Sequence, residues 1–501
     1  MSTKQTTTIL AVASVATAFT LAVKYKDNQR QKEQLVLETQ KKTTAPTCKG
    51  YPVIGSLPYV LWHKEKLYEF IAQQMEEMDT LTMFIQMLGR PPRVITIDPE
   101  IIEYILRSNF ANYPKGLIIR QSLGDLLGDG IFTSNGEVWR YQRKMASHIF
   151  NVSNFQNRFT EVFVNELDVI CREIFDPKIK TQESVDFHDI MHRYTLDSFA
   201  LLGYGVELKA STNKEDMPFI TSFDICQRNC FERLHSPIAR LKEAIQSMYL
   251  PFEKTMAYHY KVVHEFSNEI VQERRKKVAE GQEFNDLLYR FMVARNQNGE
   301  PLNDQELGDN ILNFIIAGRD TTAQLLSWTF YNLMLYPRIE KKLVAEIKTH
   351  WPKEIQDPTE LLYETLRLYP SVPMATRYNI EDDILPDGTF IKEGTTVAYS
   401  AYVLGRSKKI WGSDAKDYSP ERWIDKSGKL RRETQGRWPV FSGGPRVCLG
   451  QNLAILEAII AMATMLQKYK FSLVPGQDIT YLSSLTFPMK YGLKVYIQQR
   501  E

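Results

Sequence analysis

The segment from Trp438 to Gly450 constrains the fold of this chain more than any other. It is a loop rich in glycine and proline that presents one cysteine, Cys448, immediately before an apolar pattern with helical spacing over 453–466. The N-terminal end of a helix carries unpaired N–H groups and positive partial charge, and Arg446 adds a cation, so a thiolate is favoured there. Glycines at 443, 444 and 450 let a flat cofactor approach the backbone. Since most cysteines are small buried hydrophobes, a structural role for Cys448 stays open on the chemistry of the loop alone.

The same loop carries a specific signature. Its residues Phe441, Gly444, Arg446, Cys448 and Gly450 fit the pattern F-x-x-G-x-R-x-C-x-G without a departure, and in this the chain resembles the haem-binding loop of the cytochrome P450 family. The resemblance implies a haem b cofactor, with Cys448 as the thiolate ligand of its iron and the other four residues around it. We expect the remaining cysteines to be structural; they are Cys48, Cys171, Cys226 and Cys230.

A long apolar pattern from Leu307 to Tyr336 predicts a helix of about 45 Å through the body of the protein. Inside it, the segment 317–322 reads Ala-Gly-Arg-Asp-Thr-Thr, where an acid and two hydroxyls interrupt an apolar core. Because Ser and Thr side chains can hydrogen-bond backward to helix carbonyls, a local bulge fits this segment, and so does a satisfied polar kink. The segment is similar to the A-G-x-D-T-T oxygen-activation motif of the family. That resemblance implies that Asp320 and Thr321 relay protons through water.

Two charged residues on a second helix point to a structural network. Glu364 and Arg367 lie on one helix face, which alone would be a commonplace ion pair. Together with Arg422, in the segment 420–423, they resemble the E-x-x-R helix and the P-E-R-F loop of the family. Here Trp423 replaces the commoner Phe. The resemblance implies that Glu364, Arg367 and Arg422 secure the fold behind the cysteine loop.

A third spacing concerns the cofactor's carboxylates. Trp139 and Arg143 are four residues apart, which places an indole N–H and a guanidinium one helical turn from each other. This is similar to the W-x-x-x-R pattern of the family, whose members hold a haem propionate with it. Arg377 stands where many members add another propionate cation. A buried Trp beside a surface Arg is the alternative for the first pair.

The substrate must be argued separately, because fold does not fix it. Segments 109–116, 126–132, 367–373 and 385–389 look like those of the plant and fungal fatty-acid and alkane omega-hydroxylase clan. This implies insertion of one oxygen atom from O2 into a C–H bond of a long-chain lipid, most simply fatty acid (omega) hydroxylation. The apolar lining that we expect consists of Ile311, Phe314, Ile315, Ala317, Leu485, Phe487 and Met489. A sterol or another apolar substrate would suit the same slot.

Two other functions compete with hydroxylation. A haem-thiolate isomerase or lyase of oxidised lipids needs no electron donor, but such members generally lack the acid and hydroxyl that are present here at Asp320 and Thr321. A non-catalytic haem sensor would need neither that pair nor a lipid pocket. Turnover without NADPH, or binding without turnover, would favour one or the other.

The remaining pattern predicts a mainly α fold with a small β region, as in cytochrome P450. The β-like runs are 81–88 and 93–97, which form a hairpin, then 397–403 and 493–497. We divide the chain into an N-terminal membrane anchor helix over 1–26, a polar and Pro-rich linker over 27–60, and a haem-thiolate catalytic domain over 61–501. The anchor rests on about 20 apolar residues with a basic flank. A cleaved signal peptide, a mitochondrial presequence and an interfacial helix stay open.

Charge and length bear on the partners. The net charge of +2 gives no reason to expect nucleic acid, and 43% hydrophobic residues exclude a disordered scaffold. No flavin- or nicotinamide-binding segment follows Gly450, so the resemblance implies a separate reductase that draws on NADPH. We expect the diflavin reductase at the endoplasmic reticulum membrane, with the catalytic domain facing the cytosol; a mitochondrial location would imply a ferredoxin. The basic residues that could steer this partner are Lys426, Lys429, Arg431, Arg432 and Arg437.

Overall fold

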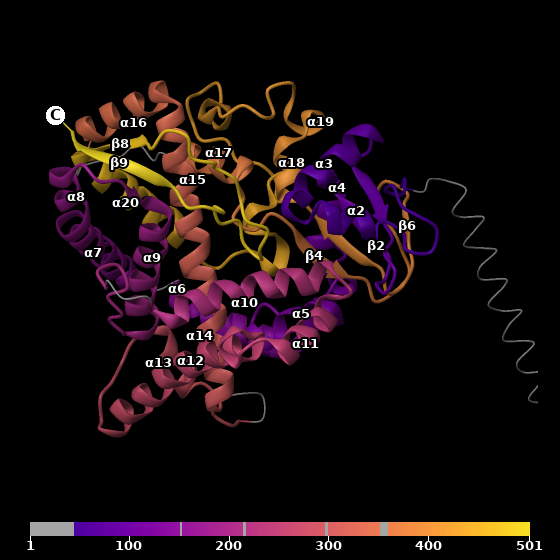
Figure 1. Cartoon of the computed structure of the whole chain (residues 1–501), viewed down its shortest axis with the longest axis horizontal. Coiled ribbons are helices and arrows are strands. Elements are labelled where there is room, and N and C mark those ends of the chain that lie inside the picture. The colour runs from indigo at the N-terminus through magenta and orange to yellow at the C-terminus, as the bar shows by residue number, and fades with distance from the viewer. Residues whose placement is uncertain (1–44, 151–152, 214–216, 296–298, 351–358, 501) are drawn as a thin grey trace, which may run out of the picture.

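Helices make up most of the chain in the computed structural model, which describes residues 45–150, 153–213, 217–295, 299–350 and 359–500 (Figure 1). The helices from the N-terminal side are α2 (Leu57–Trp62), α3 (Leu67–Glu77), α4 (Pro99–Glu103), α5 (Leu117–Leu127), α6 (Gly136–Phe150), α7 (Ser153–Ile170), α8 (Asp176–Thr181), α9 (Phe187–Tyr204), α10 (Pro218–His235) and α11 (Ala239–Tyr249). They continue as α12 (Met256–Ala279), α13 (Leu287–Val293), α14 (Asp304–Ile315), α15 (Thr321–Leu335), α16 (Pro337–His350), α17 (Thr359–Leu368), α18 (Ala401–Arg406), α19 (Lys408–Trp411) and α20 (Gln451–Lys468). The mainly α prediction is therefore confirmed.

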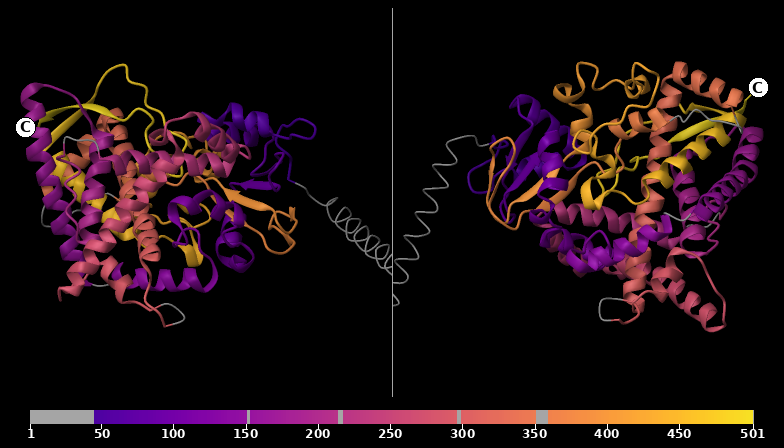
Figure 2. Two further views of the ribbon diagram at one scale, coloured as in Figure 1. Left: turned by 60° about the horizontal axis from the view of Figure 1, so that its bottom comes forward. Right: turned by 180° about the vertical axis from the view of Figure 1, so that it is seen from behind.

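Three small sheets complete the fold of the described residues. Their strands are β1 (Thr82–Ile85), β2 (Arg93–Thr96), β3 (Val185–Asp186), β4 (Ala375–Tyr378), β5 (Asp383–Ile384), β6 (Phe390–Ile391), β7 (Thr396–Tyr399), β8 (Tyr469–Leu473) and β9 (Lys494–Gln499). The sheet orders are β1-β2-β7-β4, β3-β9-β8 and β5-β6, and β2 pairs with β7 in parallel while the other pairs are antiparallel. The first sheet and the β8–β9 pair lie at opposite ends of the molecule (Figures 1 and 2).

The predicted strands are confirmed with one correction. The hairpin over 81–88 and 93–97 corresponds to β1 and β2, and the terminal run corresponds to β9. The predicted run 397–403 is wrong in its second half, because the strand ends at Tyr399 and α18 follows. Ser400 accounts for the change: its N–H still reaches Thr96 at the end of β2, while its hydroxyl accepts the N–H of Val403 and caps the helix.

The predicted long helix crosses the middle of the molecule (Figure 1). It consists of α14, a π-helical turn over Ile316–Asp320 and α15, so the bulge that its polar segment allowed is present. α14 begins with a capping box between Asn303 and Glu306. Around it pack α9, α12, α17 and α20, and their apolar faces form one continuous core. The polar turn is thus held at the centre of the protein.

The N-terminal part of the described chain lies against β1. The Phe84 N–H donates to Pro46, and the Cys48 N–H donates back to Phe84. Residues 45–60, which we placed in a linker, are thereby packed on the first sheet. The predicted anchor over 1–26 falls outside the described residues, and among the helices that are described none has the length and apolar character to span a membrane.

Candidate active site

Cys448 lies between a short helical turn and the start of α20. Its N–H donates to the carbonyl of Phe441 at 2.9 Å, and Gly450 is the N-cap residue of α20. The side chain is accessible to small molecules, yet burial by the surrounding protein raises the pKa of its thiol. The backbone of Gly450 and the charge of Arg143 act in the opposite direction and favour the thiolate. The sulfur is thus accessible, and the neighbouring N–H and guanidinium favour the thiolate form, which is the form that ligates a metal.

The glycines of the cysteine loop serve different purposes. A Cβ on Gly444, whose φ is +56°, would lie 2.0 Å from the carbonyl oxygen of Leu106, and one on Gly443 would lie 2.9 Å from the side chain of Gln435. A Cβ on Gly450 would meet nothing within 4 Å. Two of the three glycines are therefore required by packing against the protein itself, and only Gly450 leaves open space beside the cysteine.

Cations from three other segments gather around Arg446 of this loop. Arg143 of α6 donates to the carbonyl of Val447 at 2.7 Å. Arg446 donates to the carbonyl of Ser134, and its burial beside Arg377 and Arg143 lowers its pKa to about 9. Burial lowers the pKa of Lys115 well below its usual range, and the charges of Arg377 and Arg446 add to the effect. The positive charges of this cluster therefore repel one another, and the repulsion lowers the pKa of both Lys115 and Arg446.

This cluster of Lys115, Arg143, Arg377 and Arg446 lacks anions. Within the described part of the chain, no carboxylate forms an ion pair with any of the four, although the Arg377 side chain is fully buried and its Nε has no hydrogen-bond partner. Burying uncompensated positive charge is costly. The two propionates of a haem would supply the missing negative charge, so these residues fit that group.

Trp139 is packed between two of these cations. The guanidinium carbons of Arg446 and Arg143 lie 4.3 and 6.0 Å from its ring centroid, and Phe110 covers it at 5.8 Å. The W-x-x-x-R pair is therefore brought to the cysteine loop. Arg143 itself is directed to the loop backbone at Val447.

A buried network lies behind the loop. Arg367 donates to both carboxylate oxygens of Glu364 at 2.7 Å, and both side chains are fully buried. Arg422 lies 3.6 Å from the same carboxylate. The indole N–H of Trp423 donates to Glu364 at 3.0 Å, which a Phe at that position could not do. Arg367 also binds the carbonyls of Ala415 and Asp417, so the network ties α17 to the segment before the cysteine loop.

The acid and the hydroxyl of the central helix have separate partners. The Thr321 hydroxyl donates to the carbonyl of Ala317 at 2.6 Å across the π-helical turn. Asp320 is buried, which raises the pKa of its carboxyl, while Arg319 and Gln227 favour the charged form. Arg319 donates to Asp320 at 2.9 Å and to Asp224 of α10 at 2.7 Å. The carboxylate of Asp320 is thus fixed by its neighbour in the chain.

Residues on α9 also contact this segment. His192 places Nδ1 3.5 Å from a carboxylate oxygen of Asp320, and burial together with Arg319 lowers the pKa of His192 to about 3, so its ring is neutral. A Cβ on Gly318 would lie 2.2 Å from the ring of Phe199. Gly318 is therefore required for contact with α9.

The predicted apolar lining divides into two groups. Ala317 and Leu485 are partly exposed. The other five are buried in the core: Ile311, Phe314, Ile315, Phe487 and Met489. Phe314, for example, contacts the ring of Phe291, and Phe487 stacks on Tyr481. Further exposed apolar surface beside the central helix comes from Phe132, whose N–H donates to Asn313, and from Val372, which follows the Ser371 that donates to Thr321; they are 37% and 39% exposed.

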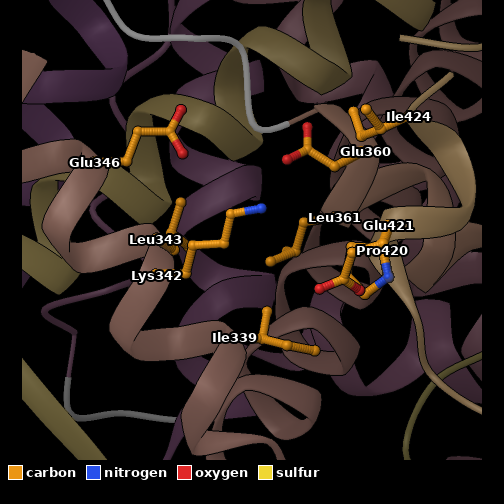
Figure 3. A pocket seen from close by; sticks show the side chains of 9 residues that line it. All are labelled: Ile339, Lys342, Leu343, Glu346, Glu360, Leu361, Pro420, Glu421 and Ile424. Carbon is orange, nitrogen blue, oxygen red and sulfur yellow. The ribbon is translucent and has the colours of Figure 1, made fainter. Parts of the chain in front are cut away.

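A small hollow lies apart from these residues, between α16, α17 and the segment 420–424 (Figure 3). Its lining is Ile339, Lys342, Leu343, Glu346, Glu360, Leu361, Pro420, Glu421 and Ile424. Its volume of about 30 Å³ accommodates only a few waters. A lipid needs several hundred Å³, so this hollow is not a substrate site.

Sequence reasoning missed several residues of the site. Lys115 stands in the segment 109–116, which already resembled the hydroxylase clan. No acidic residue lies near it in the sequence, and this could have indicated a cation that binds an external anion. His192 and Asp224 carry no local signal, because only tertiary packing brings α9 and α10 to the central helix.

The basic residues near the loop are only partly available to a partner. Glu433 lies 2.7 Å from Arg431 and 3.4 Å from Arg437, and Arg437 also donates to the carbonyl of Ile410. These pairs reduce the positive charge that the sequence suggested at this surface.

A mainly helical fold with a lone cysteine at the start of a helix, a cluster of unpaired cations and an acid–hydroxyl pair on a bulged central helix defines a haem-thiolate protein. Comparison with known families agrees, since the family described as Cytochrome P450 matches residues 46–490, and the chain belongs to that family. It is 31% identical to cytochrome P450 94A2 of Vicia sativa, covering 91% of this chain and 92% of the relative. It is 31% identical to cytochrome P450 86B1 of Arabidopsis thaliana (90% and 85%) and 34% identical to cytochrome P450 monooxygenase cyp1 of Mycosarcoma maydis (89% and 74%).

Proposed function

We propose that this cytochrome P450 monooxygenase hydroxylates long-chain fatty acids at or near the chain terminus. The observation that carries the monooxygenase part is the joint presence of the Cys448 loop and the Asp320–Thr321 pair on the central helix. The fatty-acid part rests on the resemblance of segments 109–116 and 126–132 to the plant and fungal hydroxylase clan. Relatives from two plants and a fungus are in keeping with that resemblance.

Each residue has a defined task in this proposal. Cys448 ligates the haem iron, and the Gly450 N–H and Arg143 stabilise its negative charge. Arg377, Arg446 and Lys115 hold the two propionates. When bound, haem supplies the iron at which O2 is activated and one oxygen atom is transferred to a C–H bond, while the other leaves as water.

The acid–hydroxyl pair handles the two protons that the reaction consumes. Thr321 presents its hydroxyl at the π-helical turn, where its bond to Ala317 fixes the oxygen. Asp320, held by Arg319, holds and releases a proton at its carboxylate. An isomerase or lyase would have no use for this pair, so its presence favours hydroxylation.

The partner and the location follow from the same proposal. Electrons come from NADPH through a separate diflavin reductase, docked near the surface residues Lys426, Lys429 and Arg432. The protein works at the endoplasmic reticulum membrane. The membrane part of this proposal is supported by an apolar surface made of Val53, Ile54, Leu88, Ile238, Leu241, Ile245, Met248, Tyr249 and Phe252, all exposed.

This apolar surface is continuous across three segments. The Leu88 N–H reaches the carbonyl of Ile54, and Gly89 lies against Pro237 just before α11. On α11 the apolar residues recur every three or four positions, which places them on one face. An exposed apolar face of this kind is suited to a lipid surface.

The test is turnover by the full-length protein in membranes with a diflavin reductase and NADPH. The panel contains saturated and unsaturated fatty acids, alkanes and a sterol, and mass spectrometry gives the position of the new hydroxyl. We expect terminal or near-terminal hydroxylation of fatty acids. Turnover of the sterol alone would replace the fatty-acid proposal, and product formation without NADPH would replace the monooxygenase mechanism.

A further inference from the structure

Two buried side-chain amides flank the π-helical turn of the central helix, one on each side. Asn313 lies four residues before Ala317, and Gln324 lies three residues after Thr321, so they flank the π-helical turn on either side. Both side chains are fully buried. Neither belongs to the oxygen-activation segment or to the cysteine loop.

Asn313 binds the loop between α5 and α6. Its Nδ2 donates to the carbonyl of Leu127 at 2.7 Å, and its Oδ1 accepts the N–H of Phe132 at 3.2 Å. A Cβ on Gly130 would lie 2.0 Å from the amide nitrogen, so the loop fits closely over Asn313. One turn earlier, Asp309 accepts the N–H of Asp129. The backbone of 127–132 is therefore held to α14 by side chains of that helix.

Gln324 binds the loop between β8 and β9 in the same manner. Its Oε1 accepts the N–H of Phe487 at 2.9 Å, and its Nε2 donates to the hydroxyl of Thr486 at 2.9 Å. One turn later, the indole of Trp328 donates to the carbonyl of Phe487 at 3.1 Å. The segment 486–487 is thus held to α15 by two side chains.

Each clamped loop offers apolar surface. Phe132, whose N–H is held by Asn313, is 37% exposed. Leu485, next to the residues held by Gln324, is partly exposed, as are Ala317 and Thr321 on the helix between the two amides. The loops meet the helix within about one turn of the polar segment that the proposed reaction uses. Their positions relative to that segment are fixed by the two amides.

We infer that Asn313 and Gln324 are positioning residues that determine specificity: each holds one wall of the substrate space against the central helix, and together they decide which length of alkyl chain fits. The inference rests on the proposed function only in assigning that space to an alkyl chain. Loss of either amide would leave a buried N–H and its loop without their partner, and the loop would open more often.

The first test measures amide hydrogen exchange in the haem-loaded full-length protein. We expect Asn313→Leu to speed exchange in 127–134 about tenfold and to leave 484–490 unchanged, and Gln324→Leu to do the reverse. Asn310→Leu is the matched control, because Asn310 is also buried on α14 and, within the described part of the chain, its amide donates to the carbonyl of Glu306 in its own helix and to no loop. If a leucine variant does not bind haem, Asn313→Ser or Gln324→Ser takes its place, because a serine side chain is too short to reach the loop.

The second test reads the shape of the space without any turnover. N-alkylimidazoles from butyl to dodecyl bind haem iron, and the shift of the Soret band gives Kd for each chain length. We expect the ratio of the weakest to the tightest Kd in the series to fall about threefold or more in each variant. In the Asn310 control this ratio should equal that of the wild type.

The outcomes separate the two parts of the inference. Unchanged exchange in the clamped loops would overturn the positioning role. Faster exchange with an unchanged chain-length profile would overturn the specificity role. Failure of the proposed fatty-acid reaction would show as missing product from the wild type, while both of these readouts would still be obtained.

Discussion

At the scale of single residues, the buried charges depend on individual hydrogen bonds. The Glu364 carboxylate accepts hydrogen bonds from Arg367, from Trp423 and from the N–H of Ser419, and it forms an ion pair with Arg422. A carboxylate buried in this way is stable only while its partners are complete. The replacement of the commoner Phe by Trp423 therefore adds a donor to this chain's network.

Trp423→Phe removes that donor and is expected to lower the free energy of unfolding by about 1.5–3 kcal/mol, since it weakens the support of a charged group. Chemical unfolding of the haem-loaded protein measures the change. Trp411→Phe is the control, because the Trp411 indole is buried without a hydrogen-bond partner. Equal losses in the two variants would mean that volume, and not the bond to Glu364, is responsible.

The Thr321 hydroxyl gives a prediction about proton delivery. Thr321→Ala should keep the haem and its thiolate spectrum but divert electrons from NADPH into peroxide, because the hydroxyl no longer assists protonation. The ratio of product to NADPH, with peroxide measured in parallel, tests it. Thr322→Ala, at the neighbouring buried hydroxyl, should remain coupled, and peroxide yields that match in both variants would count against the role of Thr321. Cys448→Ala should abolish the thiolate spectrum.

At the scale of elements, contacts between α9 and its neighbours position the central helix. Phe199 packs where Gly318 lacks a side chain, and the Thr195 hydroxyl donates to the carbonyl of Arg319 at 2.8 Å. The π-helical turn is thus supported from α9 at adjacent residues. The local sequence allows the bulge, and the neighbouring helix stabilises it.

Gly318→Ala should destabilise the protein by about 1–3 kcal/mol, because the new methyl group would overlap the Phe199 ring. Thermal unfolding of the haem-loaded protein measures this. If the overlap is the cause, the double variant with Phe199→Leu should recover part of the loss relative to Phe199→Leu alone. Independent, additive losses would contradict the contact.

Glu166 on α7 makes stability depend on pH. Burial, with the charges of Asp197 and Glu207, raises its pKa to about 7 from an ordinary value near 4.3. Between these values the folded protein binds more protons than the unfolded chain, so this group makes stability fall as pH rises from about 5 to 7. Glu166→Gln should flatten that slope in urea unfolding, whereas Glu161→Gln, at an exposed site of the same helix, should not. A slope unchanged by Glu166→Gln would refute the assignment.

At the scale of the whole molecule, the apolar surface around α11 predicts how the protein sits on a membrane. In lipid vesicles, a spin label at Met248→Cys should be more accessible to oxygen than to a water-soluble nickel complex, because it enters the lipid. A label at Tyr496→Cys should show the opposite preference, because β9 lies at the upper left of Figure 1 while α11 lies below the centre. The same preference at both positions would exclude this orientation.

The sequence by itself determined the parts of the protein that depend on neighbours in the chain. The cysteine loop before α20 and the long helix are each contained in one continuous segment, so the local pattern is enough to predict them. The β1–β2 hairpin was predicted for the same reason. The bulge was one of two outcomes that segment 317–322 allowed, and the structural role of the Glu364–Arg367 pair was implied by the family resemblance. The end of β7 at Tyr399 was missed, because Ser400 both bonds to Thr96 at the end of β2 and caps α18, and the first of these contacts depends on a distant segment.

Only the tertiary structure decided which side chains meet across distant segments. It brought Lys115 to Arg377 and Arg446, His192 to Asp320, and the two amides of the central helix to their loops. It also placed five of the seven predicted lining residues in the core. An apolar residue on a buried helix can face either the core or a ligand with the same local pattern, and the choice is made by whatever packs against it.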